Sequence, residues 1–415
     1  MRRATVLAAG LMLTGCTAAG PRPGDRPAAG PPDMGAEPSV RVGVRVDTSS
    51  IRVGGTTGAV LVGEDGSERA RGGAGHEWVV GRAGGGLEAE GPGERVRVRG
   101  TLVVRPAGSG QVVVDGTRFR GSILLLPAES GVTAVNVLDV ESYLLGVVPL
   151  EIGRGRPPEE LEAVKAQAIA ARTYTIRHMG RRSELGFDLY GTVQDQAYGG
   201  ADAEDEVTAR AVRETRGEIV VHDGQPIEAY YHSTCGGRTA ALEEVWNGEP
   251  RPYLRSVSDA SPEGGWYCET SNRFRWTEEW RGAALHTALG EGLAASSHGG
   301  GTVTRVESVE ILDRTPSGRV ATLQIRTNLG EHRVHGDSVR WVLRPEPGRI
   351  LNSAAIEVHP YGDDRVEGLV VEGAGWGHGI GMCQVGALGR ARAGQSYRDI
   401  LLSYYPGTEI ARLYP

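Results

Sequence analysis

The chain has 415 residues and a formal net charge of −7 at pH 7, with 39% hydrophobic and 23% charged residues. This composition is that of a folded protein with one large domain or two ordinary ones, so a wholly disordered chain is excluded. The acidic balance, without a long basic run, argues against nucleic acid as a partner, because a surface that binds phosphates needs clustered Lys and Arg.

The N-terminus predicts export. Arg2 and Arg3 precede an apolar stretch at residues 4–13 that is too short to span a bilayer. The following Leu-Thr-Gly-Cys, which ends at Cys16, resembles a bacterial lipoprotein signal. It implies removal of residues 1–15 and lipidation of Cys16. An ordinary secretory signal with an incidental cysteine is the alternative.

Residues 16–38 hold six prolines among Gly and Ala, which predicts a tether between the lipid anchor and the folded body. Thr17 is not an acidic retention signal of the kind associated with the inner membrane. In a cell with two membranes we therefore expect an outer-membrane anchor that faces the periplasm.

Residues 39–135 are expected to form a β-rich scaffold. Short runs alternate apolar and other residues with glycine between them, as in 40–46, 96–99 and 111–114. Such period-two patterns predict antiparallel strands.

The next feature is a single carboxylate, Glu151, which ends an apolar run that begins near Asn136. An apolar site raises the pKa of a carboxyl by desolvation, which a general acid needs near neutral pH. A structural alternative remains, in which Glu151 caps the following turn or faces water.

A helix is predicted from Pro157 and Pro158 to Gly180, with acidic residues at its start, basic residues at its end and many alanines between. Lys165 and Arg172 are seven residues apart and share a face. Lys165 is the one lysine of the chain, against 44 arginines. Its surroundings match neither a phosphate-binding loop nor a protein kinase. These cations form either a solvated face or part of a binding site.

Five segments, in order, resemble the SpoIID/LytB family: residues 141–151, 162–174, 194–200, 230–237 and 375–387. The likeness spans roughly residues 39–410. It implies a peptidoglycan lytic transglycosylase with Glu151 as the catalytic acid. One departure is the stretch 152–156, which lengthens the link between Glu151 and the helix. The substrate-binding residues expected from the resemblance and the chemistry are Lys165, Arg172, Gln196, Tyr198, His232, Ser233 and His378.

One carboxylate suffices for this reaction. A glycoside hydrolase usually needs a second carboxylate to attack or to activate water. In a lytic transglycosylase the C6 hydroxyl of the muramyl sugar is the nucleophile, and it is already tethered. The alternatives are a non-catalytic module that binds cell-wall glycan or enhances an amidase, and a zinc-dependent envelope protein. The expected partners are peptidoglycan glycan strands, the membrane through the lipid anchor alone, and a cell-wall amidase or divisome protein.

Three cysteines remain besides Cys16, an odd number in an oxidising compartment. A disulfide between Cys235 and Cys268 is the first expectation. A zinc site with His232, Cys235, Cys268 and one further histidine is the alternative, since tetrahedral zinc needs four ligands. The chemistry itself requires no cofactor. Trp376 either stacks on a sugar or fills the core.

The whole pattern predicts an α+β fold, mainly antiparallel β, with one Ala-rich helix that carries the motif. The catalytic core is expected at residues 136–412. Within it, about 278–345 is expected to be a small inserted α/β subdomain, with a helix from Glu278 to Leu293 and strands around Ile325 and Val334. His332 and His335 are expected on opposite faces of a strand, which makes them a poor ligand pair.

Overall fold

The computed structural model describes residues 35–246, 248–296, 301–346 and 348–415. The predicted signal, the lipidated Cys16 and most of the tether lie outside the described residues. Within the described part, no helix is both long and apolar enough to cross a membrane.

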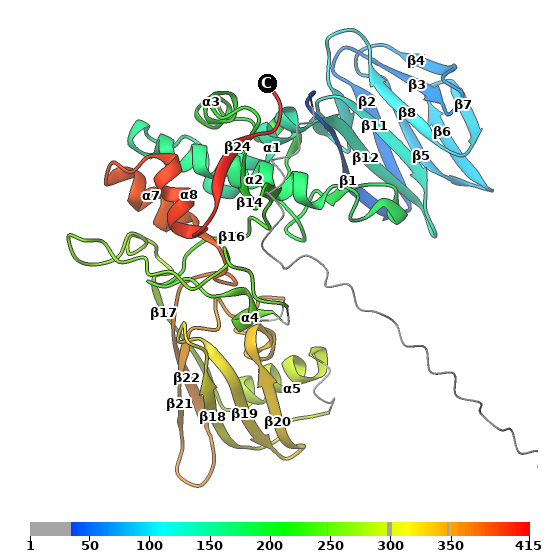
Figure 1. Cartoon of the computed structure of the whole chain (residues 1–415). Helices are drawn as coiled ribbons and strands as arrows, with labels where there is room; N and C mark the ends of the chain where they lie inside the picture. The colour runs from blue at the N-terminus through cyan, green and yellow to red at the C-terminus, as the bar shows by residue number, and fades with distance from the viewer. Residues whose placement is uncertain (1–34, 247, 297–300, 347) are drawn as a thin grey trace, which may run out of the picture.

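The N-terminal part consists of two mainly antiparallel sheets whose buried residues share one hydrophobic core (Figure 1). One sheet has the order β13-β1-β12-β11-β8-β3-β4, with strands Leu189–Tyr190, Ser39–Thr48, Val132–Asp139, Ser122–Pro127, Leu102–Pro106, Ala59–Gly63 and Glu68–Gly72. The other has the order β10-β9-β2-β5-β6-β7, with strands Thr117–Phe119, Val112–Val114, Ser50–Gly55, Glu77–Ala83, Gly86–Gly91 and Glu94–Arg99. These strands agree with the alternating pattern of the sequence, whose inward side chains include the fully buried Trp78.

The middle part is helical and is built around α2 (Leu161–His178), which is buried along most of its length. Four helices contact α2: α1 (Val140–Ile152), α3 (Glu206–Glu214), α7 (Gln384–Arg392) and α8 (Tyr397–Tyr404). Its small alanine side chains let these neighbours approach closely, and Figure 1 shows α7 and α8, from the end of the chain, beside it.

Short strands complete the middle part. A three-stranded sheet has the order β15-β14-β24, with strands Gln225–Pro226, Glu218–His222 and Glu409–Arg412. Separately, β16 (Tyr231–His232) pairs in parallel with β23 (Met382–Cys383). The last strands of the chain thereby return to the centre of the molecule.

The remaining part has its own hydrophobic core. It contains two three-stranded antiparallel sheets: β17-β22-β21 (Arg275–Arg281, Gly368–Ala374, Ile356–Tyr361) and β18-β19-β20 (Val306–Arg314, Val320–Thr327, Gly330–His335). Its helices are α5 (Ala283–Ala295) and α6 (Val339–Val342), and α4 (Leu242–Val245) lies near it in Figure 1.

The predicted helix from Glu278 is wrong at its start. Residues up to Arg281 form strand β17, in which Trp276 and Trp280 both point into the core. Two tryptophans four residues apart fit a helix and a strand equally well, and pairing with β22 decides for the strand. Helix α5 begins only after Gly282, whose φ of +48° breaks the strand.

The strands predicted around Ile325 and Val334 are present as β19 and β20. His332 is buried and His335 exposed, as expected for opposite faces of β20. The core of this part also takes in β17, β21 and β22, so it extends on both sides of residues 278–345. The α+β fold with mainly antiparallel sheets is confirmed.

Candidate active site

Glu151 lies in the last turn of α1. The helix starts at Asp139, whose side chain accepts the backbone N–H of Ser142, and it ends at Gly153 with a φ of +95°. Most of α1 before Glu151 is buried, while Glu151 itself stays partly exposed. The apolar run thus carries the carboxylate to the edge of the core.

Three polar groups hold the Glu151 carboxyl. The backbone N–H of Ala197 donates a hydrogen bond of 2.9 Å to its Oε1. The side chains of Tyr231 and Gln384 also hydrogen-bond to it. Burial raises the pKa of Glu151 above its ordinary value, although all three hydrogen bonds act in the opposite direction.

Gln196 orients the groups around this carboxyl. Its Nε2 donates to the Tyr231 hydroxyl at 3.0 Å and to the Ala171 carbonyl at 3.3 Å. Its Oε1 accepts hydroxyl protons from Thr175 at 2.9 Å and from Tyr143 at 3.3 Å. With these bonds Gln196 is saturated and almost fully buried, so it positions Tyr231 for Glu151 and leaves no group free for a sugar.

Gln384 is positioned in a similar way, against the same face of α2 that Gln196 contacts through Ala171 and Thr175. Its Nε2 donates to Oε1 of the buried Gln167 at 3.3 Å. Tyr231 and Gln384 come from the paired strands β16 and β23 and the start of α7, far apart in the sequence. The sequence analysis did not select either residue, although both stand inside the segments that resemble the family.

Asp195 fixes the loop that brings Ala197 to Glu151. Its fully buried carboxylate accepts hydrogen bonds from the Arg182 guanidinium, at 3.0 Å to each oxygen, and from the Tyr190 N–H at 2.9 Å. The Tyr174 hydroxyl donates a further bond of 3.2 Å. Sequence reasoning missed this role, since the partners of Asp195 lie on three different elements.

Lys165 and Arg172 share a face of α2, as predicted, but the structure does not bring that face to Glu151. Residues two apart on a helix point about 200° apart. Gln167, on the face near the acid, therefore points away from Lys165. The Lys165 ammonium lies 2.8 Å from both Glu162 and Glu214.

Arg172 is completely buried. Its guanidinium makes two bonds to Glu141, of 2.9 and 2.7 Å, and contacts the Glu218 carbonyl at 3.1 Å. Both cations thus have protein partners instead of the open glycan cleft expected of them. These carboxylate partners come from three helices: Glu141 from α1, Glu162 from α2 and Glu214 from α3. Packing of α1 and α3 against α2 brings Glu141 and Glu214 to the two cations.

The two predicted histidines, His232 and His378, contact the backbone around Tyr231 and each other. His378 donates from Nε2 to the Tyr231 carbonyl at 3.0 Å and accepts the Ile380 N–H on Nδ1 at 3.0 Å. Burial lowers its pKa to about 3, so it is neutral and acts as a brace for Tyr231. His232 is buried, with Nδ1 3.1 Å from the Ile380 carbonyl and a ring centre 5.5 Å from that of His378.

The other predicted residues differ in exposure. Tyr198 is buried; its hydroxyl donates to Asn136 of β12 at 2.7 Å, and its ring centre lies 4.9 Å from that of Tyr143 in α1, so it joins β12 to α1. Ser233 is partly exposed, and its hydroxyl oxygen lies 3.3 Å from the hydroxyl oxygen of Thr234. Trp376 is 48% exposed, with the Arg273 guanidinium 5.8 Å from its ring, which leaves it free to stack on a ligand.

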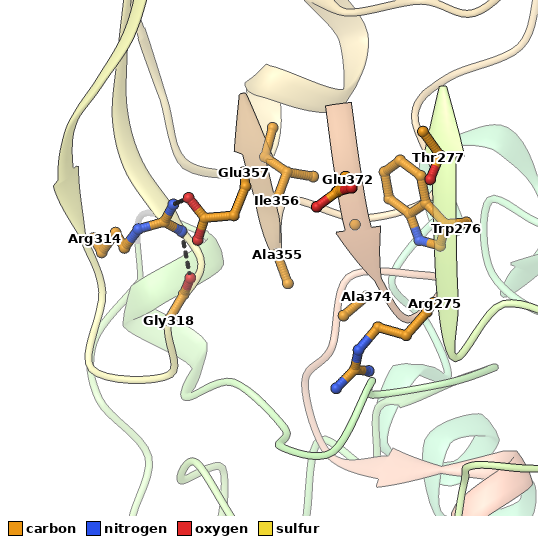
Figure 2. Close-up of a pocket in the computed structure, with 11 residues that line it drawn as sticks. Arg275, Trp276, Thr277, Arg314, Gly318, Ala355, Ile356, Glu357, Glu372 and Ala374 are labelled. Atoms are coloured by element: carbon orange, nitrogen blue, oxygen red, sulfur yellow. Dashed lines mark hydrogen bonds and ion pairs between the residues drawn. The ribbon is translucent and has the colours of Figure 1, made fainter. Parts of the chain in front are cut away.

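A pocket of about 590 Å³ lies in the C-terminal part (Figure 2). It is lined by residues of β17, β21 and β22, by Arg314 at the end of β18 and by Gly318 in the loop that follows. Arg314 pairs there with Glu357 of β21 at 2.6 Å. It shares no residue with the surroundings of Glu151.

The predicted disulfide partners are adjacent but are present as thiols. The Sγ atoms of Cys235 and Cys268 are 3.5 Å apart, and both side chains are buried. The nearest further groups are Cys383 and Asp259, while His232 does not belong to this cluster.

Comparisons with known proteins agree with this organisation. Residues 128–222, which include Glu151, α2 and Gln196, match the family model of the Stage II sporulation protein, SpoIID. Residues 263–381 match a domain of unknown function, DUF8618, which coincides with most of the C-terminal part and its pocket.

Among curated proteins, the chain is 32% identical to the Stage II sporulation protein D of Bacillus subtilis (strain 168) over 293 residues, 67% of this chain and 76% of the relative. It is 33% identical to an uncharacterized protein of Brachyspira hyodysenteriae over 66% of this chain and 67% of that protein. An amidase enhancer of Bacillus subtilis is 29% identical over 64% of this chain and 40% of its own length. The family model and these identities show that the chain belongs to the SpoIID/LytB family, with a cell-wall-related function of the SpoIID type.

Proposed function

We propose that the protein is a peptidoglycan lytic transglycosylase that cleaves the bond between N-acetylmuramic acid and N-acetylglucosamine. The observation that carries this proposal is the environment of Glu151. Its carboxyl is partly exposed, has a raised pKa and is held by an N–H, a hydroxyl and an amide. Among the described residues, the groups that shift this pKa include no second carboxyl.

The reaction follows from one acid. Glu151 donates its proton to the glycosidic oxygen as the bond to C1 of the muramyl sugar breaks, and the sugar develops oxocarbenium character. The resulting carboxylate then takes the proton of the C6 hydroxyl of the same sugar while that oxygen bonds to C1. The products are a free 4-hydroxyl on the leaving sugar and a 1,6-anhydro ring, and Glu151 is protonated again.

The surroundings of Glu151 suit both halves of this cycle. Burial favours the protonated acid of the first step. The Ala197 N–H and the donors on Tyr231 and Gln384 stabilise the carboxylate that forms between the steps. Because Gln196, Gln167 and Asp195 fix these donors, little reorganisation is needed as the charge appears.

The test is Glu151→Gln, which keeps the shape of the side chain and removes the transferable proton. Loss of general acid catalysis should lower glycan cleavage by about 10²–10⁴-fold. Glu159→Gln is the matched control, since Glu159 is an exposed carboxylate a few residues further along. Purified glycan strands are digested with the full chain in detergent, and the products are analysed by mass spectrometry. Anhydro ends support the proposal, and reducing ends would refute it in favour of a hydrolase.

A glycan-binding or amidase-enhancing role is the second candidate, favoured by the likeness to an amidase enhancer. In that case wild-type protein leaves glycan strands intact but sediments with them, and Glu151→Gln changes neither result. Stimulation of a cell-wall amidase by both forms would then identify the partner.

We further propose that the chain is exported and anchored through lipidated Cys16, with residues 17–38 as the tether. Glu37 fixes where the tether meets the body. Its carboxylate pairs with Arg216 at 2.5 Å and accepts the Glu141 N–H at 2.8 Å. The folded body therefore begins a few residues before β1.

A further inference from the structure

Three cysteines and one aspartate meet in the interior, beside the paired strands β16 and β23. The ligand atoms of Cys235, Asp259, Cys268 and Cys383 all lie within 4.8 Å of one another, and all four residues are buried. They come from separate segments of the chain, and none takes part in the proposed reaction. A role for the cluster must therefore come from its own chemistry.

We infer that these four side chains form a structural zinc site. Thiolates and a carboxylate are zinc ligands, and four protein ligands close the tetrahedron without an open position, as in structural sites. This set differs from the alternative proposed from sequence, in which His232 and a further histidine stood where Asp259 and Cys383 lie.

The distances fit a tetrahedron around zinc. With Zn–S bonds of about 2.3 Å and a Zn–O bond of about 2.0 Å, neighbouring sulfurs are about 3.8 Å apart and a sulfur is about 3.5 Å from the oxygen. The observed separations are 3.5 Å between the Sγ atoms of Cys235 and Cys268, and 3.6 Å from Cys235 Sγ to Asp259 Oδ2. A contraction of about 1 Å brings even a pair at the 4.8 Å limit to the S–S spacing of zinc sites.

The Asp259 carboxylate is oriented for this purpose. Its Oδ1 accepts the Tyr404 hydroxyl proton at 2.6 Å and lies 3.4 Å from Nε of Arg390. Its Oδ2 is the oxygen that faces Cys235. A metal-binding carboxylate usually has one oxygen held by hydrogen bonds, as Oδ1 is here, and the other free for the metal, as Oδ2 would be.

Cys383 is prepared in the same way. Its sulfur accepts the backbone N–H groups of Cys235, at 3.2 Å, and Gly386, at 3.3 Å. It also caps the N-terminus of the nine-residue helix α7, where the helix dipole favours a negative charge. A Cβ on Gly386 would lie 2.6 Å from Asp259 Oδ2 and 2.2 Å from the Tyr404 hydroxyl, so the cluster needs glycine here.

Zinc binding would account for all four groups at once. The metal displaces the three thiol protons, and three thiolates with one carboxylate around Zn²⁺ carry a net charge of −2 beside the Arg390 guanidinium. A disulfide between Cys235 and Cys268 would use only two of the four groups and would leave Cys383 and Asp259 buried beside it. The zinc site would tie the loop after β16 to the start of α7, and so fix the strands from which Tyr231 and Gln384 extend.

The test measures metal and thiols, and does not depend on the proposed activity. The full chain is purified without reductant or chelator, and its metal content is determined by mass spectrometry. We expect one zinc per chain, and strongly reduced zinc in Cys383→Ser and Asp259→Asn. Ser271→Ala, in the loop that follows Cys268, is the matched control and should keep the metal.

Measurements on the wild-type protein keep the inference testable if these variants do not fold. After removal of zinc with a chelator, alkylation and peptide mapping should find Cys235, Cys268 and Cys383 as free thiols. Cobalt added to the zinc-free protein should then give the charge-transfer and visible bands of a sulfur-ligated tetrahedral ion. A Cys235–Cys268 disulfide in the isolated protein, or no zinc and no cobalt spectrum with three free thiols, would overturn the inference.

Discussion

The buried pair of Glu141 and Arg172 gives a sharp test of how the helices around the active site are held together. Glu141→Gln keeps the size of the side chain and removes its charge. In the wild type, the Glu141 carboxylate accepts two bonds from Arg172, the Gly217 N–H at 3.1 Å and the Tyr414 hydroxyl at 2.7 Å. The Arg172 side chain has no exposed surface, so water cannot solvate its guanidinium in place of Glu141.

The expected loss follows from this geometry. Removal of one partner of a buried ion pair costs about 3–5 kcal/mol, because the remaining charge stays buried without compensation. Typical domains have a total stability of about 5–15 kcal/mol, so the variant should be marginal. Urea unfolding followed by circular dichroism measures the loss as a lower midpoint at an unchanged slope.

Glu68→Gln is the matched control. Glu68 pairs with Arg71 at 2.6 Å, but both side chains are about half exposed, and we expect no shift of the midpoint. A wild-type midpoint for Glu141→Gln would refute the reasoning. It would mean that Arg172 is solvated in solution and available to the glycan, as the family resemblance implies.

Three further predictions concern the acid, the lysine and the anchor. Since the pKa of Glu151 is raised in the folded protein, its protonated form persists above pH 4.5; kcat/KM for glycan cleavage should be full below the shifted pKa and fall as pH rises through it. A fall that is complete at or below pH 4.5 would contradict this. Lys165→Arg should lower the stability by up to about 1 kcal/mol in thermal melts, because a guanidinium is too wide for the 2.8 Å contacts with Glu162 and Glu214. An unchanged melt would argue against these ion pairs, and a raised KM would support a contact with glycan. Cys16→Ser should release the protein from membranes without altering its circular dichroism, and retention after a high-salt wash would exclude lipidation.

The sequence by itself determined the fold class and the position of the acid. Period-two alternation predicted the N-terminal strands because one face of each strand packs against the core. The prolines before α2 and the glycine after it marked the ends of that helix. The apolar run before Glu151 correctly indicated desolvation, since local hydrophobicity is enough to predict burial of the turn that carries it.

Tertiary structure decided the partners of each side chain. Tyr231 and Gln384 reach Glu151 only because β16 and β23 pair across about 150 residues of sequence, a separation that no local pattern encodes. The shared face of Lys165 and Arg172 was predictable from helical spacing, but its direction was not, because that depends on how α3 packs against α2. In the same way, Asp259 and Cys383 join Cys235 and Cys268 only in the folded chain, since a ligand set is defined by distances in space.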